Sequence, residues 1–452
     1  MTTTEKMNLD ERYKYLRIMR QQYRQAQTRR AKQELLDQME TVTGLQRKYL
    51  IQLMRPEALK RRPRQQERGP EYGPDVDTTL ALIWEAQDYI CAERLQPVLV
   101  FTAEQLAKHG ELQLGPRLRE QLGTIHPSTI RRHLPPRPTP RAVPPRKRPE
   151  NAAQAQIPIR RIPWDTAEPG HCELDLVHHC GLRTVGEYGY TLQLIDVATG
   201  WSARRAILGR SYIVVADALY YLFHQMPFPI LEVHPDSGGE FLNDLLWHFL
   251  HAHYPELDAS RSKPGHPNDN RFVEQKNDTL VRAFLGDVRL DTVTQIRYLN
   301  HIYERMHVYY NYLQPVMHQI DKEWVPHPDG AGGYTRRQHD LAAPPLVRLC
   351  QTATLPATTC AALLEQRTAL NPLALRREIY AALQHLFTYP GAVPGLPENV
   401  YETLAQPELF PAAMAALQAG ETVDSTEAAL PAVPPVATPS RSPSQKGGRS
   451  GS

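Results

Sequence analysis

Three acidic side chains in the central part of the sequence could act together in chemistry. They are Asp175, Asp236 and Glu274, in the segments ELDLV, HPDSGGEF and NRFVEQKN. Carboxylates are the hard oxygen ligands that Mg²⁺ prefers, and several carboxylates in one place repel one another without a cation. Taken alone, Glu274 has a simpler explanation, because acidic residues are favoured near helix N-termini. The question is whether the surrounding elements bring the three acids together.

The segment KPGHPNDNRFVEQKN, residues 263–277, changes character halfway along its length. Its first half contains Pro264, Gly265 and Pro267, which interrupt a helical hydrogen-bond ladder. From about Asn270 onward the spacing of apolar residues favours a helix, with an asparagine available as its N-cap. Glu274 falls in the first turn of that helix. We therefore expect a stiff turn to fix the direction in which this carboxylate points.

Upstream of this helix, the hydrophobic pattern indicates a sheet with associated helices. Short apolar runs bounded by turn residues predict three antiparallel strands, then alternating helices and strands, in the order βββαβαβα. The expected strands cover 171–181, 190–201, 202–208, 228–236 and 257–262, and the expected helices cover 213–225, 240–253 and the segment from 270 onward. Asp175 then lies within the first strand and Asp236 at the end of the fourth. Sites in open α/β sheets form at the carboxyl ends of strands, so this order favours convergence of the acids.

These residues resemble a known family. The stretches ELDLVHHCG, LIDVATGW, HPDSGGEF and RSKPGHPNDNRFVEQKNDTLVRAFLG, spread over roughly 165–315, are similar to the ribonuclease-H-like catalytic core of DDE transposases and retroviral integrases. The resemblance is strongest to bacterial insertion-sequence transposases of the integrase type. The chain departs from the family pattern at Pro235 and Ser237, where the family usually has Ser and Asn around the second aspartate.

The resemblance implies a mixed five-stranded sheet and a specific chemistry. Two Mg²⁺ ions, or Mn²⁺ in their place, would be held with Asp175 bridging both and Asp236 and Glu274 each completing one. Such a pair stabilises charge on a scissile phosphate and activates a water or a DNA 3′-OH. The expected activity is cleavage of 3′ ends and their transfer into target DNA. The expected partners are element ends, target DNA, further copies of the chain and, possible in this group, a helper ATPase.

The N-terminal part of the chain is basic and helical. Residues 1–160 contain 29 Lys and Arg against 18 Asp and Glu, whereas the rest of the chain is acidic on balance. Segment 31–55 predicts two helices around Thr43-Gly44, which is the pattern of a helix-turn-helix with Gln46, Arg47 and Lys48 at the start of its second helix. A helical hairpin used only for packing remains an alternative.

A second helical unit precedes the central region. It ends in HPSTIRRHL, where we expect Ser128 to cap a short helix that presents Thr129, Arg131 and Arg132. Two such units, each followed by a basic proline-rich stretch, favour DNA binding by this half of the chain. Near Glu274, we expect Lys276, Asn277 and Arg282 to contact DNA, with a solvated helix face as the alternative.

The chain therefore divides into several parts. We predict a helix-turn-helix domain (1–60), a second helical DNA-binding domain (74–134), a proline-rich linker (135–163), the catalytic core (164–330), a small α-helical module (335–400) and a disordered tail (420–452). In the helical module, Asn371 and Pro372 begin an amphipathic helix with the stripe Leu375, Ile379, Leu383 and Leu386. That helix could pack internally or against another copy of the chain.

Several other features are assigned to structure rather than to chemistry. Asp196 precedes Thr-Gly and is expected to form a turn, and Glu240 is expected to be a helix N-terminal acid. The cluster His171, Cys172, His178, His179 and Cys180 matches no standard zinc module. The 5 cysteines have no CxxC spacing, and no apolar run is long enough for a membrane span or a secretory signal, which predicts a cytoplasmic protein. The resemblance to insertion-sequence transposases implies that it is bacterial and associated with the nucleoid.

Two further functions use the same features. A repressor or domesticated relative would bind DNA without catalysis, but it would require a broken acid triad. A nuclease that cuts without strand transfer would use the same triad and differ only in outcome. Because all three acids are present, the transposase is the favoured hypothesis.

Overall fold

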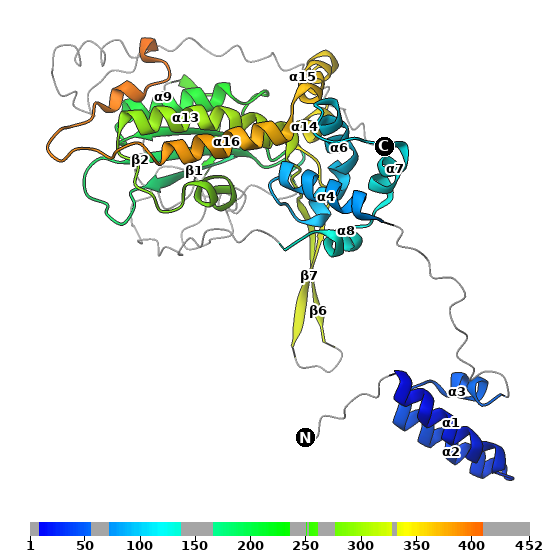
Figure 1. Ribbon diagram of the computed structural model, residues 1–452. Coiled ribbons are helices and arrows are strands. Elements are labelled where there is room, and N and C mark those ends of the chain that lie inside the picture. The colour runs from blue at the N-terminus through cyan, green and yellow to red at the C-terminus, as the bar shows by residue number, and fades with distance from the viewer. Residues whose placement is uncertain are drawn as a thin grey trace, which may run out of the picture. The chain divides into compact units, whose positions relative to one another are not determined.

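The computed structural model describes residues 9–55, 72–136, 166–235, 250, 253–260, 276–327 and 332–409. The chain forms two compact units, Met1–Glu71 and Tyr72–Ser452 (Figure 1). Asp236, Glu240, Glu274, most of the predicted linker and the predicted tail lie outside the described residues. Within the described ranges, no helix is long and apolar enough to cross a membrane.

The first unit contains three helices, α1 (Leu9–Gln25), α2 (Arg29–Thr43) and α3 (Arg47–Leu53). The side chain of Thr28 accepts a hydrogen bond from the Ala31 N–H and caps α2. Gly44 ends that helix with φ at 65°, a left-handed conformation that glycine adopts without a Cβ penalty. The predicted turn at Thr43-Gly44 is confirmed. The core of the unit consists of Leu16, Met19, Leu36, Met39, Leu50, Leu53 and Met54.

The second unit begins with a helical region around its own apolar core. This region comprises α4 (Pro74–Ala86), α5 (Ala92–Leu95), a 3₁₀ turn (Gln96–Val98), α6 (Leu99–Lys108), α7 (Pro116–Thr124) and α8 (Pro127–His133). The prediction that Ser128 caps the last of these helices was wrong. His126 is the N-cap, because its Nδ1 accepts the N–H of Ser128 and Pro127 occupies the first helical position.

A mixed five-stranded sheet follows, with the order β3-β2-β1-β4-β5. Its strands are β1 (His171–His179), β2 (Gly189–Asp196), β3 (Ser202–Leu208), β4 (Glu232–Pro235) and β5 (Asp258–Ala259). The first three are antiparallel, and β4 runs parallel to both β1 and β5. The five predicted strands and their order are confirmed, although β2, β4 and β5 are shorter than expected.

The two faces of the sheet carry different helices. Leu174, Leu192 and Ala203 share one apolar core with α9 (Tyr212–His224). Val177 and Ala206, on the other face, share a second core with α13 (Val293–Val308), which begins with a capping box formed by Thr292 and Gln295. A π-helical stretch, Tyr309–Leu313, continues α13. Asp175 alternates with Leu174 along β1, so it belongs to the face covered by α13.

The predicted C-terminal helical module is part of this same unit. Its helices are α14 (Pro345–Gln351), α15 (Ala357–Ala369) and α16 (Pro372–Leu386), followed by 3₁₀ turns at Val400–Thr403 and Pro407–Leu409. Asn371 caps α16 as predicted, accepting the N–H groups of Leu373 and Ala374. Ile379, Leu383 and Leu386 enter the core beneath α13, so α16 packs internally (Figure 1).

A β-hairpin that the sequence analysis did not predict lies between α13 and α14. Its strands are β6 (Gln319–Pro326) and β7 (Gly333–His339), paired antiparallel. The expectation of an all-helical module from residue 335 onward was therefore wrong for its first five residues, which form most of β7.

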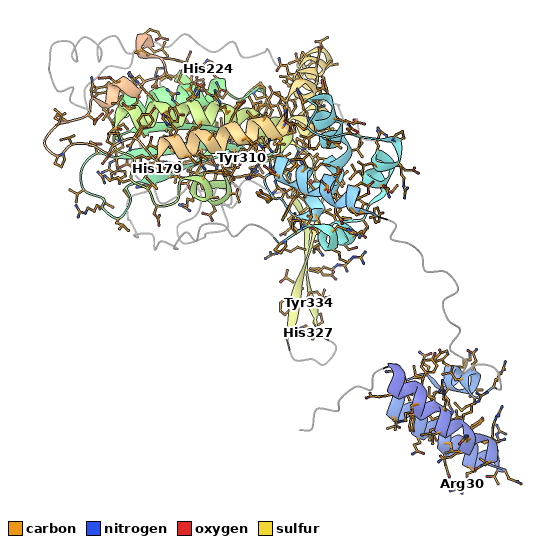
Figure 2. The ribbon with its side chains drawn as sticks, in the orientation of Figure 1. Arg30, His179, His224, Tyr310, His327 and Tyr334 are labelled. Atoms are coloured by element: carbon orange, nitrogen blue, oxygen red, sulfur yellow. The ribbon has the colours of Figure 1, made fainter. Side chains whose placement is uncertain are left out.

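Two histidines with lowered pKa values, the buried His179 and the half-buried His307, make the second unit sensitive to acid. Burial lowers the pKa of His179 to about 3, and its Nε2 shares a 2.7 Å hydrogen bond with Thr191. Burial likewise lowers the pKa of His307 to about 4. Figure 2 shows His179 within the sheet region. Because both values lie below 6.5, the unfolded chain binds more protons between pH 6.5 and 3, and stability is lost as pH falls through that range.

We expect the free energy of unfolding to fall between pH 7 and pH 5, and the His179→Gln variant to show a shallower fall. Each such histidine contributes a slope of up to about 1.4 kcal/mol per pH unit. Urea unfolding followed by tryptophan fluorescence reports on this unit, because all 5 tryptophans lie beyond residue 72. Identical pH dependence in the wild type and the variant would contradict this assignment.

Candidate active site

Asp175 lies in the middle of β1, the strand at the centre of the sheet order. It is 9% exposed. On one side it pairs with Gln193 of β2, and on the other its neighbour Leu174 pairs with Pro235, the last residue of β4. A carboxylate at this position stands beside the carboxyl end of a parallel strand, where sites form in sheets of this type.

Two neutral donors hold the Asp175 carboxylate in one orientation. Its Oδ1 accepts the backbone N–H of Leu176 at 2.8 Å. Its Oδ2 accepts a hydrogen bond from Nδ2 of Asn277 at 2.5 Å, across 102 residues of sequence. Hydrogen bonds to a carboxylate favour its charged form, which is the form that binds cations.

Asn277 begins a π-helical turn, Asn277–Arg282, that leads into the short helix α12 (Ala283–Leu285). Leu280 and Val281 are buried in the core on the α13 face. The helix expected from about Asn270 onward is thus present in its described part, from residue 276, with a wider turn than an α-helix. Such π-helical turns are rare and frequently occur at functional sites.

The predicted DNA contacts in this segment differ in their placement. Asn277 is fully buried against Asp175, which does not agree with a role on an exposed DNA-binding surface. Arg282 is partly exposed and pairs with Asp278 at 2.7 Å. Lys276 is half-buried and directly precedes Asn277 in the sequence. Lys276 and Arg282 therefore remain available as contacts at the rim of this region.

The pKa of Lys276 reflects its cationic surroundings. Burial lowers this pKa to about 7, and three nearby guanidinium groups act in the same direction. These groups belong to Arg94, Arg204 and Arg348. An approaching anion would favour the protonated form of Lys276, so this region is suited to receive negative charge.

A row of polar side chains crosses the sheet beside Asp175. The strand register aligns Asp175 with Gln193 and Gln193 with Arg204, so the three belong to the same face. Gln193 is 0% and Arg204 4% exposed, and within the described part of the chain their side-chain nitrogens make no hydrogen bond. The Arg204 guanidinium lies over the rings of Tyr303 and Tyr310, at 5.8 and 5.4 Å from the ring centres.

This row could not be predicted from the sequence, because only the pairing register places these residues together. The one available signal was the pair Arg204-Arg205 inside an apolar strand pattern, since arginine is almost never fully buried without a reason. Burial lowers the pKa of Arg204, while the two tyrosines oppose that effect.

The predicted contacts in the first unit lie near the surface. Gln46 and Lys48 are exposed at the start of α3. Arg47 is engaged by Asp37 of α2, with Glu40 3.9 Å away. Base or phosphate contacts by Arg47 would therefore compete with an intramolecular ion pair of the kind that contributes little in water.

The second predicted recognition helix, α8, shows a similar arrangement. Arg131 is exposed and bonds to Glu93 of α5. Arg132 is exposed and donates to Thr129 at 3.2 Å, and Thr129 itself is half-buried. Two exposed guanidinium groups thus lie in the last turn of a short helix.

The residues assigned to structure lie in ordinary surroundings. Asp196 is fully buried and accepts hydrogen bonds from the N–H groups of Gly170 and Thr199, both at 2.8 Å, which confirms its turn-forming role. His171 pairs with Glu232 at 2.8 Å, and the carboxylate raises the pKa of this histidine. Cys172 and Cys180 are both buried.

Comparisons with known proteins identify a relative but no function. No family model matches the chain. Over 320 residues it is 30% identical to the uncharacterized protein y4rM of Sinorhizobium fredii (strain NBRC 101917 / NGR234), which covers 70% of this chain and 89% of the relative. The chain belongs to the family of y4rM. Because the y4rM relative is itself uncharacterized, membership of this family leaves the activity to be argued from the site.

A solved structure shows a weaker likeness. In the simian T-cell lymphotropic virus intasome in complex with PP2A regulatory subunit B56 gamma, one chain is 15% identical, with coverage of 42% of this chain and 75% of that chain. The TM-score of 0.27 is too low to equate the two folds.

We expect Asn277→Asp to destabilise the second unit more strongly at pH 8 than at pH 5. At pH 8 two buried carboxylates would repel each other, whereas at pH 5 they could share a proton. Asn277→Leu should cost about 1–3 kcal/mol at both pH values, because it leaves a carboxylate oxygen without its donor. Thermal unfolding at the two pH values measures the difference.

Asp278→Asn is the matched control, because Asp278 is exposed and adjoins Asn277 in sequence. It should change the unfolding temperature little at either pH. An equal effect of Asn277→Asp at pH 5 and pH 8 would contradict the proposed charge interaction with Asp175.

Proposed function

We propose that the chain is a DNA transposase of the integrase type, which uses divalent metal ions to cleave the 3′ ends of a DNA element and join them to target DNA. The hydrogen bond between Asn277 and Asp175 carries this proposal. It ties the first of the three acids to the segment that directly follows the third. The order of the strands and helices along the chain and the mixed sheet that they form support the same function.

Chain connectivity favours convergence of the three acids. Asp236 directly follows Pro235, whose partner in the sheet is Leu174, the neighbour of Asp175. Consecutive Cα atoms are about 3.8 Å apart, so the chain keeps the Cα atom of Asp236 within about 3.8 Å of that of Pro235. Glu274 precedes Asn277 by three residues, a separation that extends to about 11 Å at most. Both acids are therefore within reach of the Asp175 carboxylate.

The described residues fit a site for hard divalent cations. Asp175 offers carboxylate oxygens that Leu176 and Asn277 hold in place through neutral donors. Mg²⁺ is usually bound by only one or two carboxylates together with substrate phosphates. Asp175, Asp236 and Glu274 can supply the carboxylates, and the DNA would supply the phosphates. Bound there, two such ions would stabilise charge on the scissile phosphate and activate a water or a 3′-OH.

The residues of this chain would position the DNA for that chemistry. Asn277 keeps Asp175 oriented, so that the carboxylate need not reorganise when the substrate arrives. Lys276, with a pKa of about 7, would gain a proton next to a phosphodiester and pair with it. The exposed residues Gln46, Lys48 and Arg132 would contact the element ends. Assembly on two ends would require more than one copy of the chain, and a helper ATPase would fit the same scheme.

We expect Asp175→Asn, Asp236→Asn and Glu274→Gln to abolish strand transfer while leaving binding of the DNA ends nearly unchanged. Each variant removes one ligand charge and keeps the shape of the side chain, so metal binding weakens without a change in the N-terminal contacts. The assay joins a duplex carrying the inverted repeats that flank the coding region to a supercoiled plasmid in Mg²⁺.

Asp278→Asn, which alters an exposed acid beside Asn277, should retain activity and serves as the control. The metal assignment fails if joining survives EDTA. The residue assignment fails if any of the three variants keeps more than a few per cent of the wild-type rate.

A further inference from the structure

The β6–β7 hairpin stands apart from the three apolar cores of its unit. Its strands pair with each other in a sheet of their own, and Figure 1 shows the ribbon extending beyond the helices. His327 and Tyr334 are labelled toward its far end in Figure 2. At about 3.3 Å per residue, eight residues of β6 span about 26 Å.

Large apolar side chains of this hairpin are exposed. Ile320 is 56%, Trp324 63% and Tyr334 53% exposed. A two-stranded ribbon with both faces in water is marginally stable by itself. The pairing register puts Trp324 and Tyr334 on opposite faces of the ribbon, so each face exposes a large aromatic ring. The question is which partner these side chains suit.

The pairing register separates the charges of the hairpin onto two faces. Trp324 pairs with Thr335, and along β7 the same face continues with Arg337 and His339. We call these four residues the basic face.

The acids Asp321 and Glu323 lie on the face of the hairpin opposite to the basic face. Asp321 pairs with Gln338, and Glu323 pairs with Arg336, at an ion-pair distance of 3.9 Å. Among the described residues of the hairpin, the basic face thus combines an exposed indole with positive charge and carries no carboxylate. Its chemistry complements a polyanion that also offers apolar edges.

A short rigid connection links the base of the hairpin to the recognition helix α8. Arg131 of α8 bonds to Glu93 in α5. The next residue of α5, Arg94, donates from Nε to the carbonyl of Pro315 at 2.7 Å, four residues before β6 begins. A molecule bound by α8 would therefore lie at a fixed position relative to the hairpin.

We propose that the basic face of the β6–β7 hairpin binds duplex DNA, together with α8. The proposal rests on the proposed function for its choice of DNA as the polyanion. The DNA major groove is about 12 Å wide and admits a two-stranded β-ribbon. Arg337 pairs with a backbone phosphate, and Trp324 packs on the sugars, which makes the contact largely independent of sequence.

Two adjacent arginines provide a matched pair for the test, because Arg337 lies on the basic face and Arg336 on the opposite one. The full chain is titrated against a fluorescent 30-base-pair duplex of mixed sequence, in EDTA, at several salt concentrations. Arg337→Ala should weaken binding about three- to ten-fold and reduce the slope of log affinity against log salt by about 0.9. Arg336→Ala should change both by little.

Two further substitutions test the assignment of the face. Arg337→Lys should keep the wild-type salt slope, because it keeps the charge. Trp324→Ala should weaken binding, whereas Tyr334→Ala on the opposite face should not. Thermal unfolding of each variant verifies that the chain remains folded.

Equal effects of Arg336→Ala and Arg337→Ala would overturn the proposal. A Trp324→Ala variant that sediments differently from the wild type but binds DNA equally well would also overturn the proposal. This result would show that the hairpin contacts another copy of the chain. Binding in EDTA requires no catalysis, so a failure here leaves the strand-transfer assay unaffected. Conversely, a wild-type chain that bound no DNA at all would contradict the proposed function itself.

Discussion

The contact between Asn277 and Asp175 joins two segments that are 102 residues apart and places a carboxylate at the centre of the sheet. A charged group buried to this degree is costly unless it is hydrogen-bonded or paired. The amide of Asn277 meets part of that requirement, and the π-helical turn that begins there brings the amide to the carboxylate. The geometry of the site follows from this one constraint.

The rest of the second unit supports that contact from both sides of the sheet. On the α13 face, α16 adds a further apolar layer. Asp88, beside α4, accepts hydrogen bonds from Arg376 and Tyr380 of α16 at 3.0 and 2.8 Å. The helical region and the sheet therefore form one body, and a DNA molecule held by α8 would stand in a fixed relation to Asp175.

Elements with strong local signals could be predicted from the sequence. Alternating apolar runs gave β1, β2 and β3, Gly44 ended α2, and Asn371-Pro372 began α16. These features depend on local backbone preferences, which a single sequence reveals.

Features that depend on distant partners could not be predicted in the same way. The inward position of Asn277 and the row of Gln193 and Arg204 require the strand register and the packing of α13. The hairpin was overlooked because its apolar residues are exposed and lack the pattern of a buried strand, although Pro328-Asp329-Gly330 is a turn sequence. His126 as a cap was overlooked because serine is the commoner choice.

The central claim is that Asp175, Asp236 and Glu274 share divalent metal ions. The most direct test is an anomalous difference map from a crystal of the chain bound to a DNA end and Mn²⁺, which carboxylate sites accept in place of Mg²⁺. The account predicts Mn²⁺ within coordination distance of the Asp175 carboxylate, with Asp236 and Glu274 as co-ligands, and no Mn²⁺ there in the Asp175→Asn variant. Mn²⁺ bound away from Asp175, or bound equally well in that variant, would contradict it.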